Sequence, residues 1–412
     1  MLLRAAIDRI LFNRLAGILV YLALPLTIPG AYAANINFSG YLKSYNVWQD
    51  STKTPAFQSD AQLQSQNSIR LNLQGFGETG GVNSVWQVHY ETSPIIASGE
   101  SGIDPGTLSS SEGRWRLTDI RASLGEETPK HRILQNLDRF NLQLNFGSGD
   151  LTIGRQAISF GAARFINPTD VFLPFDVRTF NTEYRTGIDA IRFQRPFGQL
   201  GELDFGLILG PDGKAENSAA FAQIKTNLGG SDFHATAIRF AEQNLLGIGV
   251  QSSLADFGTW FEAARVNGQQ DYWRASMGLD YSFSESTLAS VEYHFNGAGS
   301  DNPSNYFNLL SQTPFTLGGV FLLGKNYLIP AVSIQLSALI SAGIQGVLNL
   351  DDHSTYTSVT LSYNVKEDLY LGAGYYHFSG SKLTLSPLGN PVLNSEYGSN
   401  PDNLFVSINY YF

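Results

Sequence analysis

The chain has 412 residues, a formal net charge of −10 at pH 7 and no cysteine. The absence of cysteine excludes disulfides, thiolate nucleophiles, zinc–thiolate sites and covalent haem attachment. The acidic balance argues against a nucleic-acid partner, because nucleic acid requires a clustered basic surface. Mean hydropathy is −0.09, which fits a soluble protein or one whose strands turn only alternate side chains toward lipid.

Residues 1–33 have the pattern of a secretory signal peptide. Three arginines precede the apolar run Leu15–Ile28, and Ala31–Ala33 forms a small-x-small cleavage site. Pro25 interrupts the run, which is shorter than the roughly 20 residues that a membrane-spanning helix needs. We therefore expect cleavage after residue 33 and a single domain over residues 34–412.

Short turns rich in Gly, Ser and Asp recur along the chain and predict a series of antiparallel hairpins. The turns are 77–81, 147–150, 197–201, 228–231, 255–257, 284–286, 337–341 and 366–368. The long connections are 49–64, 93–136, 162–186, 297–326 and 379–402, and the short ones lie near 210–218, 241–244, 267–271 and 351–353. Eight turns and nine connections predict about 18 strands, with 16 or 20 as alternatives.

Alternating apolar and polar side chains indicate which face of each predicted strand is wet. Ile69 and Leu71 share one face, whereas Arg70 between them lies on the other. Because an arginine or lysine costs about 2–4 kcal/mol near the middle of a lipid layer, we expect the charged face to line a wet interior. The interior set predicted in this way is Lys43, Arg70, His89, Glu91, Arg274, Asp280, Glu292 and His294.

The connection 162–186 is expected to fold inward. It is long, and its four phenylalanines need cover: Phe165, Phe172, Phe175 and Phe180. It also carries three charges of each sign, which would create a transverse field across a narrow passage. With two arginines of the flanking strands, the predicted constriction set is Arg155, Arg164, Asp170, Asp176, Arg178, Glu183, Arg185 and Arg192. The alternative is an outer loop with ordinary surface ion pairs, which are worth little.

The last predicted strand, 403–412, alternates apolar and polar residues and ends on Phe412. This pattern resembles the closing strand of Gram-negative outer-membrane β-barrels, where it serves as an assembly signal. The resemblance implies an all-β, transmembrane, antiparallel up-and-down β-barrel in the cell outer membrane, reached through the periplasm. Both termini would then lie on the periplasmic side, with the long loops outside.

Two further resemblances concern the third outer loop. Its position after the fifth strand is similar to that of the constriction loop of general porins. Gly154–Gln156 and Asn167–Asp170 resemble a recurring pattern in Gram-negative porin-like barrels of unassigned substrate. A bulge near Gly154 is also predicted, because Ile153 and Ile158 are out of phase. The bulge decides whether Arg155 faces the interior.

A polar interior in a barrel of about 18 strands indicates a water-filled channel. The resulting hypothesis is a porin for passive diffusion of small hydrophilic solutes or ions, surrounded by outer-membrane lipid. One alternative is a specific channel for a sugar, organic acid or exopolysaccharide, with Tyr41, Tyr272, Tyr370 and Tyr376 as inward candidates. Another is a sheath for a partner such as a multihaem cytochrome. A homo-oligomer is left open, and loops 93–136 and 297–326 are candidate docking surfaces or lids.

Catalysis and cofactors are not expected. The six histidines are dispersed along the chain, and none stands in a local motif with a serine and an acid. Asp351, Asp352 and His353 occupy a tight connection, where aspartate is favoured by turn chemistry rather than by metal binding.

Overall fold

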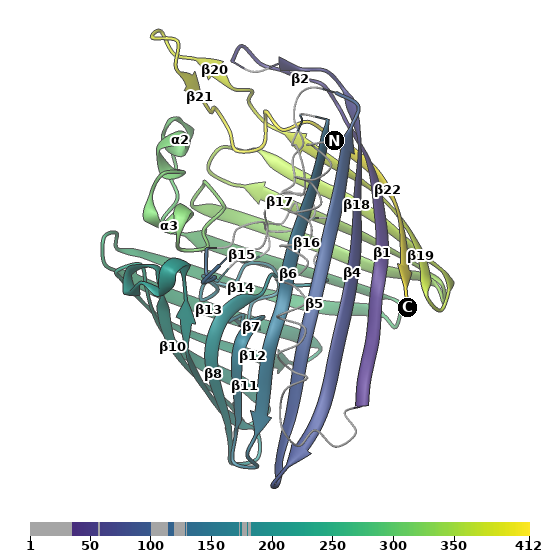
Figure 1. Cartoon of the computed structure of the whole chain (residues 1–412). Coiled ribbons are helices and arrows are strands. Elements are labelled where there is room, and N and C mark those ends of the chain that lie inside the picture. Colours follow the sequence, from purple (N-terminus) through teal and green to yellow (C-terminus); the bar gives the residue numbers. More distant parts are fainter. Residues whose placement is uncertain are drawn as a thin grey trace, which may run out of the picture.

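A computed structural model describes residues 35–56, 58–99, 114–118, 128, 130–172, 174, 179 and 183–412. Within this part of the chain, 18 strands form one antiparallel sheet that closes on itself, because β1 pairs with both β4 and β22 (Figure 1). The predicted signal peptide lies outside the described residues. Among the described residues, no helix has the length and apolar character needed to cross a membrane.

The elements follow each other in chain order around the barrel. The barrel strands are β1 (Asn35–Gln49), β4 (Gln62–Thr79), β5 (Val82–Ala97), β6 (His131–Asn145), β7 (Asp150–Gln156), β8 (Ile188–Phe197), β9 (Gly201–Leu209), β10 (Ala219–Leu228), β11 (Ser231–Phe240), β12 (Gln243–Leu254), β13 (Phe257–Asn267), β14 (Tyr272–Ser284), β15 (Thr287–Asn296), β16 (Asn326–Ser337), β17 (Ile340–Asn349), β18 (Thr355–Lys366), β19 (Leu369–Ser379) and β22 (Asn403–Tyr411). The loops carry β2 (Thr52–Lys53), β3 (Gln58–Ser59), β20 (Thr384–Leu385), β21 (Pro391–Val392), α2 (Tyr306–Leu309), α3 (Thr313–Thr316) and 3-10 turns at Pro211–Gly213, Ala215–Asn217 and Pro303–Asn305.

Each predicted turn and connection falls between two strands of the described chain, so the predicted fold and strand number are confirmed. We call the barrel end with the longer connections the loop side and the other end the turn side. The second connection is shorter than predicted, since β5 extends to residue 97 and β6 begins at residue 131. Gly229 and Gly230 both have positive φ, 63° and 83°, as a two-residue hairpin turn requires.

The two faces of the barrel differ in polarity. On β4, Ile69 and Leu71 are exposed on the outer face, whereas Arg70 is fully buried on the inner face. On β14, Trp273 is exposed and Arg274 is buried. These strands therefore have the predicted alternation.

The barrel closes over its last residue. The backbone N–H of Gly40 on β1 donates to the carbonyl of Phe412 at 2.9 Å, and that of Phe412 donates to Gly40 at 3.1 Å. The Phe412 ring lies 5.7 Å from the Phe38 ring. A Cβ atom at residue 40 would overlap the carbonyl oxygen of Arg70 and the ring of Phe412. Gly40 and the Phe412 ring therefore lie together at the seam, where β1 pairs with β22.

Neighbouring residues of β18 test the orientation of the faces. Ser362 borders a polar space inside the barrel, and Leu361 is exposed on the outer face. Because the chain has no cysteine, single-cysteine variants are labelled at one position. In vesicles, Ser362→Cys should react with a charged, membrane-impermeant maleimide, whereas Leu361→Cys should not. The reverse result would place the register one residue out and invert both faces.

Candidate functional site

The connection between β7 and β8, residues 157–187, crosses the interior, and we call its described part loop L3. Its first half binds side chains of β12 to β15, and its last residues contact β1, β4, β6 and β22. In the order of strands around the barrel, β14 and β1 belong to opposite walls. L3 therefore bridges the interior from wall to wall.

Glu262 of β13 is the first anchor of L3. Its carboxylate accepts hydrogen bonds from the backbone N–H of Ala162 at 2.6 Å and of Ala163 at 3.1 Å. Thr169 adds its backbone N–H at 2.8 Å and its hydroxyl at 2.7 Å. Since the side chain is fully buried, these four donors replace the water that a carboxylate loses on burial.

Glu292 of β15 is the second anchor. It accepts from the backbone N–H groups of Arg164, Phe165 and Ile166 at 3.0, 3.1 and 2.8 Å. The indole N–H of Trp260 donates to the same carboxylate at 2.8 Å. Hydrogen bonds to an ionised acceptor are stronger than neutral ones, so the two glutamates together fix residues 162–169 against one wall.

Aromatic side chains pack against L3. Phe172 is fully buried and lies 5.1 Å from the ring of Trp115, edge-on, and 6.0 Å from Phe160. Phe160 in turn contacts Phe221 of β10 at 5.0 Å. Trp115 comes from the second outer loop, so that loop also enters the barrel. Phe165 is partly buried in a second apolar cluster, and predicted Phe175 and Phe180 lie outside the described residues.

The end of L3 is held by the opposite wall. Glu183 forms an ion pair with Lys43 of β1 and accepts from the Tyr411 hydroxyl at 2.7 Å. The guanidinium of Arg70 lies 4.0 Å from the ring centre of Tyr184. Part of the Glu183 side chain remains exposed, at 37%. A carboxylate of L3 is therefore available to water near this wall.

The predicted constriction residues are mostly paired. Arg164 binds Asp280 at 2.7 Å, but its side chain is 55% exposed. The other described pairs are closed: Arg185 with Asp170 at 2.5 Å, Arg192 with Asp204 at 2.6 Å, and Arg155 with Asp189 at 2.7 Å. Asp176 and Arg178 lie outside the described residues.

The predicted bulge near Gly154 is wrong. β7 keeps an unbroken register with β6 and β8, and Gly154 instead has a φ of 113°. Arg155 follows Ile153 by two residues, so in this unbroken register it lies on the same strand face as the exposed Ile153. Its guanidinium donates to the carbonyls of Leu137 at 2.9 Å and Thr118 at 2.7 Å. Its guanidinium therefore ties the second loop to the wall.

A bulge occurs one hairpin earlier. The β5–β6 register shifts next to His89, where β6 has one extra residue, Asp138. Asp138 and the adjacent Arg139 are both buried and pair at 2.8 Å. Asp138 also binds Arg70 at 2.6 Å. Simple alternation cannot place two successive side chains on one face, which is why the sequence did not indicate Asp138.

Most of the predicted lining residues belong to buried networks. Arg70 binds Glu91 at 3.3 Å, and its guanidinium lies 3.2 Å from His89 Nδ1. Arg274 donates to the carbonyl of Pro168 in L3 at 3.3 Å. His294 lies 2.8 Å from the Ser276 hydroxyl, which donates to the L3 carbonyl of Ile166 at 2.6 Å. These groups support L3 rather than face open water.

Open polar space lies on the turn side of L3. A cavity of about 410 Å³ is lined by Ser362, Glu367, Tyr370, Asn409 and Tyr411. Through Tyr411 this space adjoins Glu183. The region combines polar walls with a half-exposed charge of L3.

Three loops meet on the loop side at a cluster of hydrogen bonds around Glu396, which we call the Glu396 cluster. Its carboxylate accepts from the Tyr327 hydroxyl at 2.5 Å, Asn349 Nδ2 at 2.9 Å and the backbone N–H of Leu323 at 3.1 Å. The Glu396 N–H donates to Asp352 at 2.8 Å. Burial raises the pKa of Glu396 to about 7, and the charge of Asp352 contributes in the same direction.

An 18-stranded barrel crossed by an inward third loop is the architecture of outer-membrane porins. No protein-family model and no curated protein sequence matches the chain. Similar solved structures include OccAB4 of Acinetobacter baumannii, with a TM-score of 0.57 and 9% identity over 93% of this chain and 100% of that one. OccD3 (OpdP) of Pseudomonas aeruginosa has a TM-score of 0.54 and 11% identity over 93% of each chain.

OccK5 (OpdH) of the same species has a TM-score of 0.55 and 8% identity over 91% of this chain and 98% of that one. These structures are outer-membrane porins of the Occ/OprD family. At such low identity the similarity concerns the fold, and the charged residues of this interior have to be interpreted from their own contacts.

Removing an anchor should release L3. A hydrogen bond to a charged group contributes about 1.5–3 kcal/mol, so Glu292→Ala, which removes the acceptor of three L3 amides, should speed hydrogen exchange of residues 164–166. Glu285→Ala, in the exposed β14–β15 turn, is the matched control. Unchanged exchange in Glu292→Ala would mean that L3 is held without this anchor.

The Glu396 cluster should loosen as pH rises. The closed cluster keeps the Glu396 carboxyl protonated up to about pH 7, whereas in a released loop the carboxyl loses that proton near pH 4.5. The closed form is thus most favoured below pH 4.5, loses stability between the two values and is weakest above pH 7. A spin label at Leu388→Cys, a position that is 88% exposed, should become more mobile over this range. Glu396→Gln should abolish the change, and an unaltered response in that variant would contradict the assignment.

Proposed function

We propose that the protein is an outer-membrane porin through which small hydrophilic solutes or ions diffuse passively. The observation that carries this proposal is L3, fixed across the interior by main-chain hydrogen bonds to Glu262 and Glu292. A loop anchored in this way narrows a passage without sealing the barrel with apolar side chains. We also propose that residues 1–33 are removed as a signal peptide during export.

The exposed charges of L3 support a role in solute selection. Arg164 of L3 lies against the wall of β13 to β15, and Glu183 of L3 lies against the wall of β1 and β22. Opposite charges on opposite sides of a narrow water-filled passage orient polar solutes. Since the other described constriction pairs are closed, we assign the field mainly to these two side chains.

A sheath for a multihaem partner fits the interior poorly. Such a partner needs an empty barrel, whereas L3 and residues 114–118 of the second loop occupy this one. A specific channel with an aromatic track also finds little support, because Tyr41, Tyr272 and Tyr376 are buried. Of the four candidate tyrosines, only Tyr370 lines the polar cavity.

Catalysis is not proposed. Ser276 and His294 are in contact, but both are fully buried beneath L3, and the serine hydroxyl is engaged by the Ile166 carbonyl. A substrate would have to displace L3 to reach them.

Shortening L3 tests the proposed function. Deleting residues 163–168 removes the segment bound by Glu292 and should raise single-channel conductance in a planar bilayer. Arg164→Gln should shift ion preference toward cations, because it removes the exposed positive charge of L3. Lys53→Gln, on the outer hairpin of β2 and β3, is the control. Unchanged conductance and selectivity in both L3 variants would place L3 outside the conduction path.

A further inference from the structure

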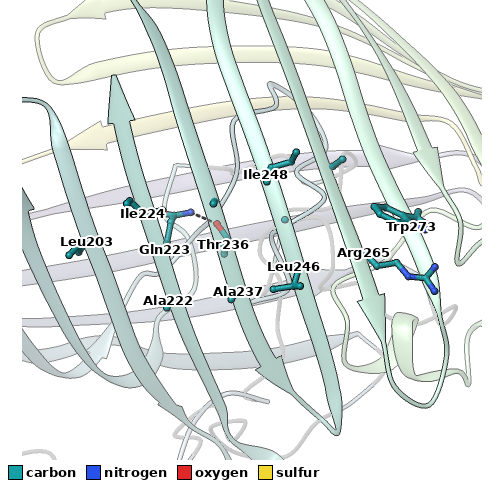
Figure 2. Close-up of a pocket in the computed structure, with 13 residues that line it drawn as sticks. Leu203, Ala222, Gln223, Ile224, Thr236, Ala237, Leu246, Ile248, Arg265 and Trp273 are labelled. Carbon is teal, nitrogen blue, oxygen red and sulfur yellow. Dashed lines mark hydrogen bonds between the residues drawn. The ribbon is translucent and has the colours of Figure 1, made fainter. Parts of the chain in front are cut away.

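A groove runs over the outer face of the barrel between β9 and β14 (Figure 2). Its volume is about 630 Å³, and its outward-facing lining is almost entirely apolar. The floor is formed by small side chains on β10, β11 and β13: Ala222, Ala235, Ala237 and Ala263. Larger side chains form its walls: Leu203, Ile224, Leu246, Ile248 and Trp273.

Strand registers explain the hollow. Ala222, Ala237 and Leu246 are directly paired across β10, β11 and β12. Outward side chains on neighbouring strands stand side by side, so alanines next to one another leave a depression where the surrounding surface carries Leu, Ile and Phe.

Two outward arginines lie at its loop-side end. Arg239 of β11 is exposed and pairs in register with Asn244 of β12. Arg265 of β13 is paired with Leu246 and lies 5.4 Å from the ring centre of Trp273. Neighbouring strands are about 4.8 Å apart, so side chains from β11 and β13 reach the same space above β12.

The position of Arg265 is fixed by its neighbours. It donates to Asp271 at 3.0 Å and to Asn267 at 2.9 Å. The other nearby acid of this rim, Glu242, is bound by Gln269 at 3.1 Å. The groove therefore has an apolar floor, and its end at the level of the outer loops carries the exposed Arg239 beside Arg265, which is paired with Asp271.

We propose that this groove binds a lipid with an anionic phosphate headgroup from the outer leaflet. Its acyl chain lies on the alanine floor, and its phosphate lies over β12 between Arg239 and Arg265. The assignment rests on the outer-membrane location given under the proposed function. A second copy of the chain is a poorer occupant, because a two-fold contact would bring these arginines close to their own copies.

Trp273 at the groove wall reports on the occupant. The full mature chain is reconstituted in phosphatidylcholine vesicles that contain either phosphatidic acid or phosphatidylcholine with brominated acyl chains, which quench tryptophan. The Trp273→Phe variant gives the signal of the other tryptophans for subtraction. Phosphatidic acid should quench Trp273 at a lower mole fraction than phosphatidylcholine. Each arginine should contribute roughly a fivefold preference.

The variants separate the contribution of the lipid headgroup from that of the apolar groove. Arg239→Gln alone, at an exposed side chain, should lower the preference, and Arg239→Gln with Arg265→Gln should abolish it. Ala237→Phe should reduce quenching by both lipids, because it fills the floor. Arg195→Gln, an exposed arginine in register with outward Leu203 on the turn side, should change nothing.

Three outcomes would overturn the assignment. One is equal quenching by the two lipids, and another is a preference that survives loss of both arginines. A disulfide-linked dimer of Ala237→Cys would indicate a second copy instead. Absence of quenching by either lipid would refute the membrane location itself, and with it the proposed function; a headgroup effect that fails while quenching persists refutes only the lipid site.

Discussion

The interior of this barrel depends on two carboxylates that face inward from adjacent parts of one wall. An isolated carboxylate is costly to bury, and Glu262 and Glu292 meet that requirement with the main chain of L3 rather than with basic side chains. The arrangement works in both directions, because a loop inside a barrel also has backbone N–H groups that need acceptors. Wall and loop therefore satisfy each other, and neither is stable in this form alone.

This reciprocity explains why so much charge is found inside and so little of it is free. The arginines of the interior bind carboxylates, as in the pairs of Arg185 with Asp170 and Arg192 with Asp204, and Arg274 binds a carbonyl group of L3. Breaking one partner of a buried pair leaves an uncompensated charge. A passage through such an interior is bounded by polar walls, and among the described constriction residues Arg164 and Glu183 have the most exposed side chains.

The fold was predictable from local patterns, whereas the site was only partly so. Glycine-rich turns and alternation between them gave the strand number, because both are set by residues adjacent in the chain. Glu262 alternates with Phe261 and Ala263 and was within reach of the same argument. Asp138 was not, since its inward position depends on an extra residue in β6. The position of Trp115 depends on packing against Phe172, a residue distant in the chain, which no local pattern encodes.

The seam between β1 and β22 has a consequence for biogenesis. β1 contains the first described residues, yet its backbone partners in β22 include residues 403–411. The hydrogen bond from Ile166 of L3 likewise cannot form before Glu292, which follows it by 126 residues, is present. Contacts of such sequence separation form slowly. The polypeptide must therefore be kept from aggregating until its final segment has been delivered, and barrel closure and interior packing are late, coupled events of assembly.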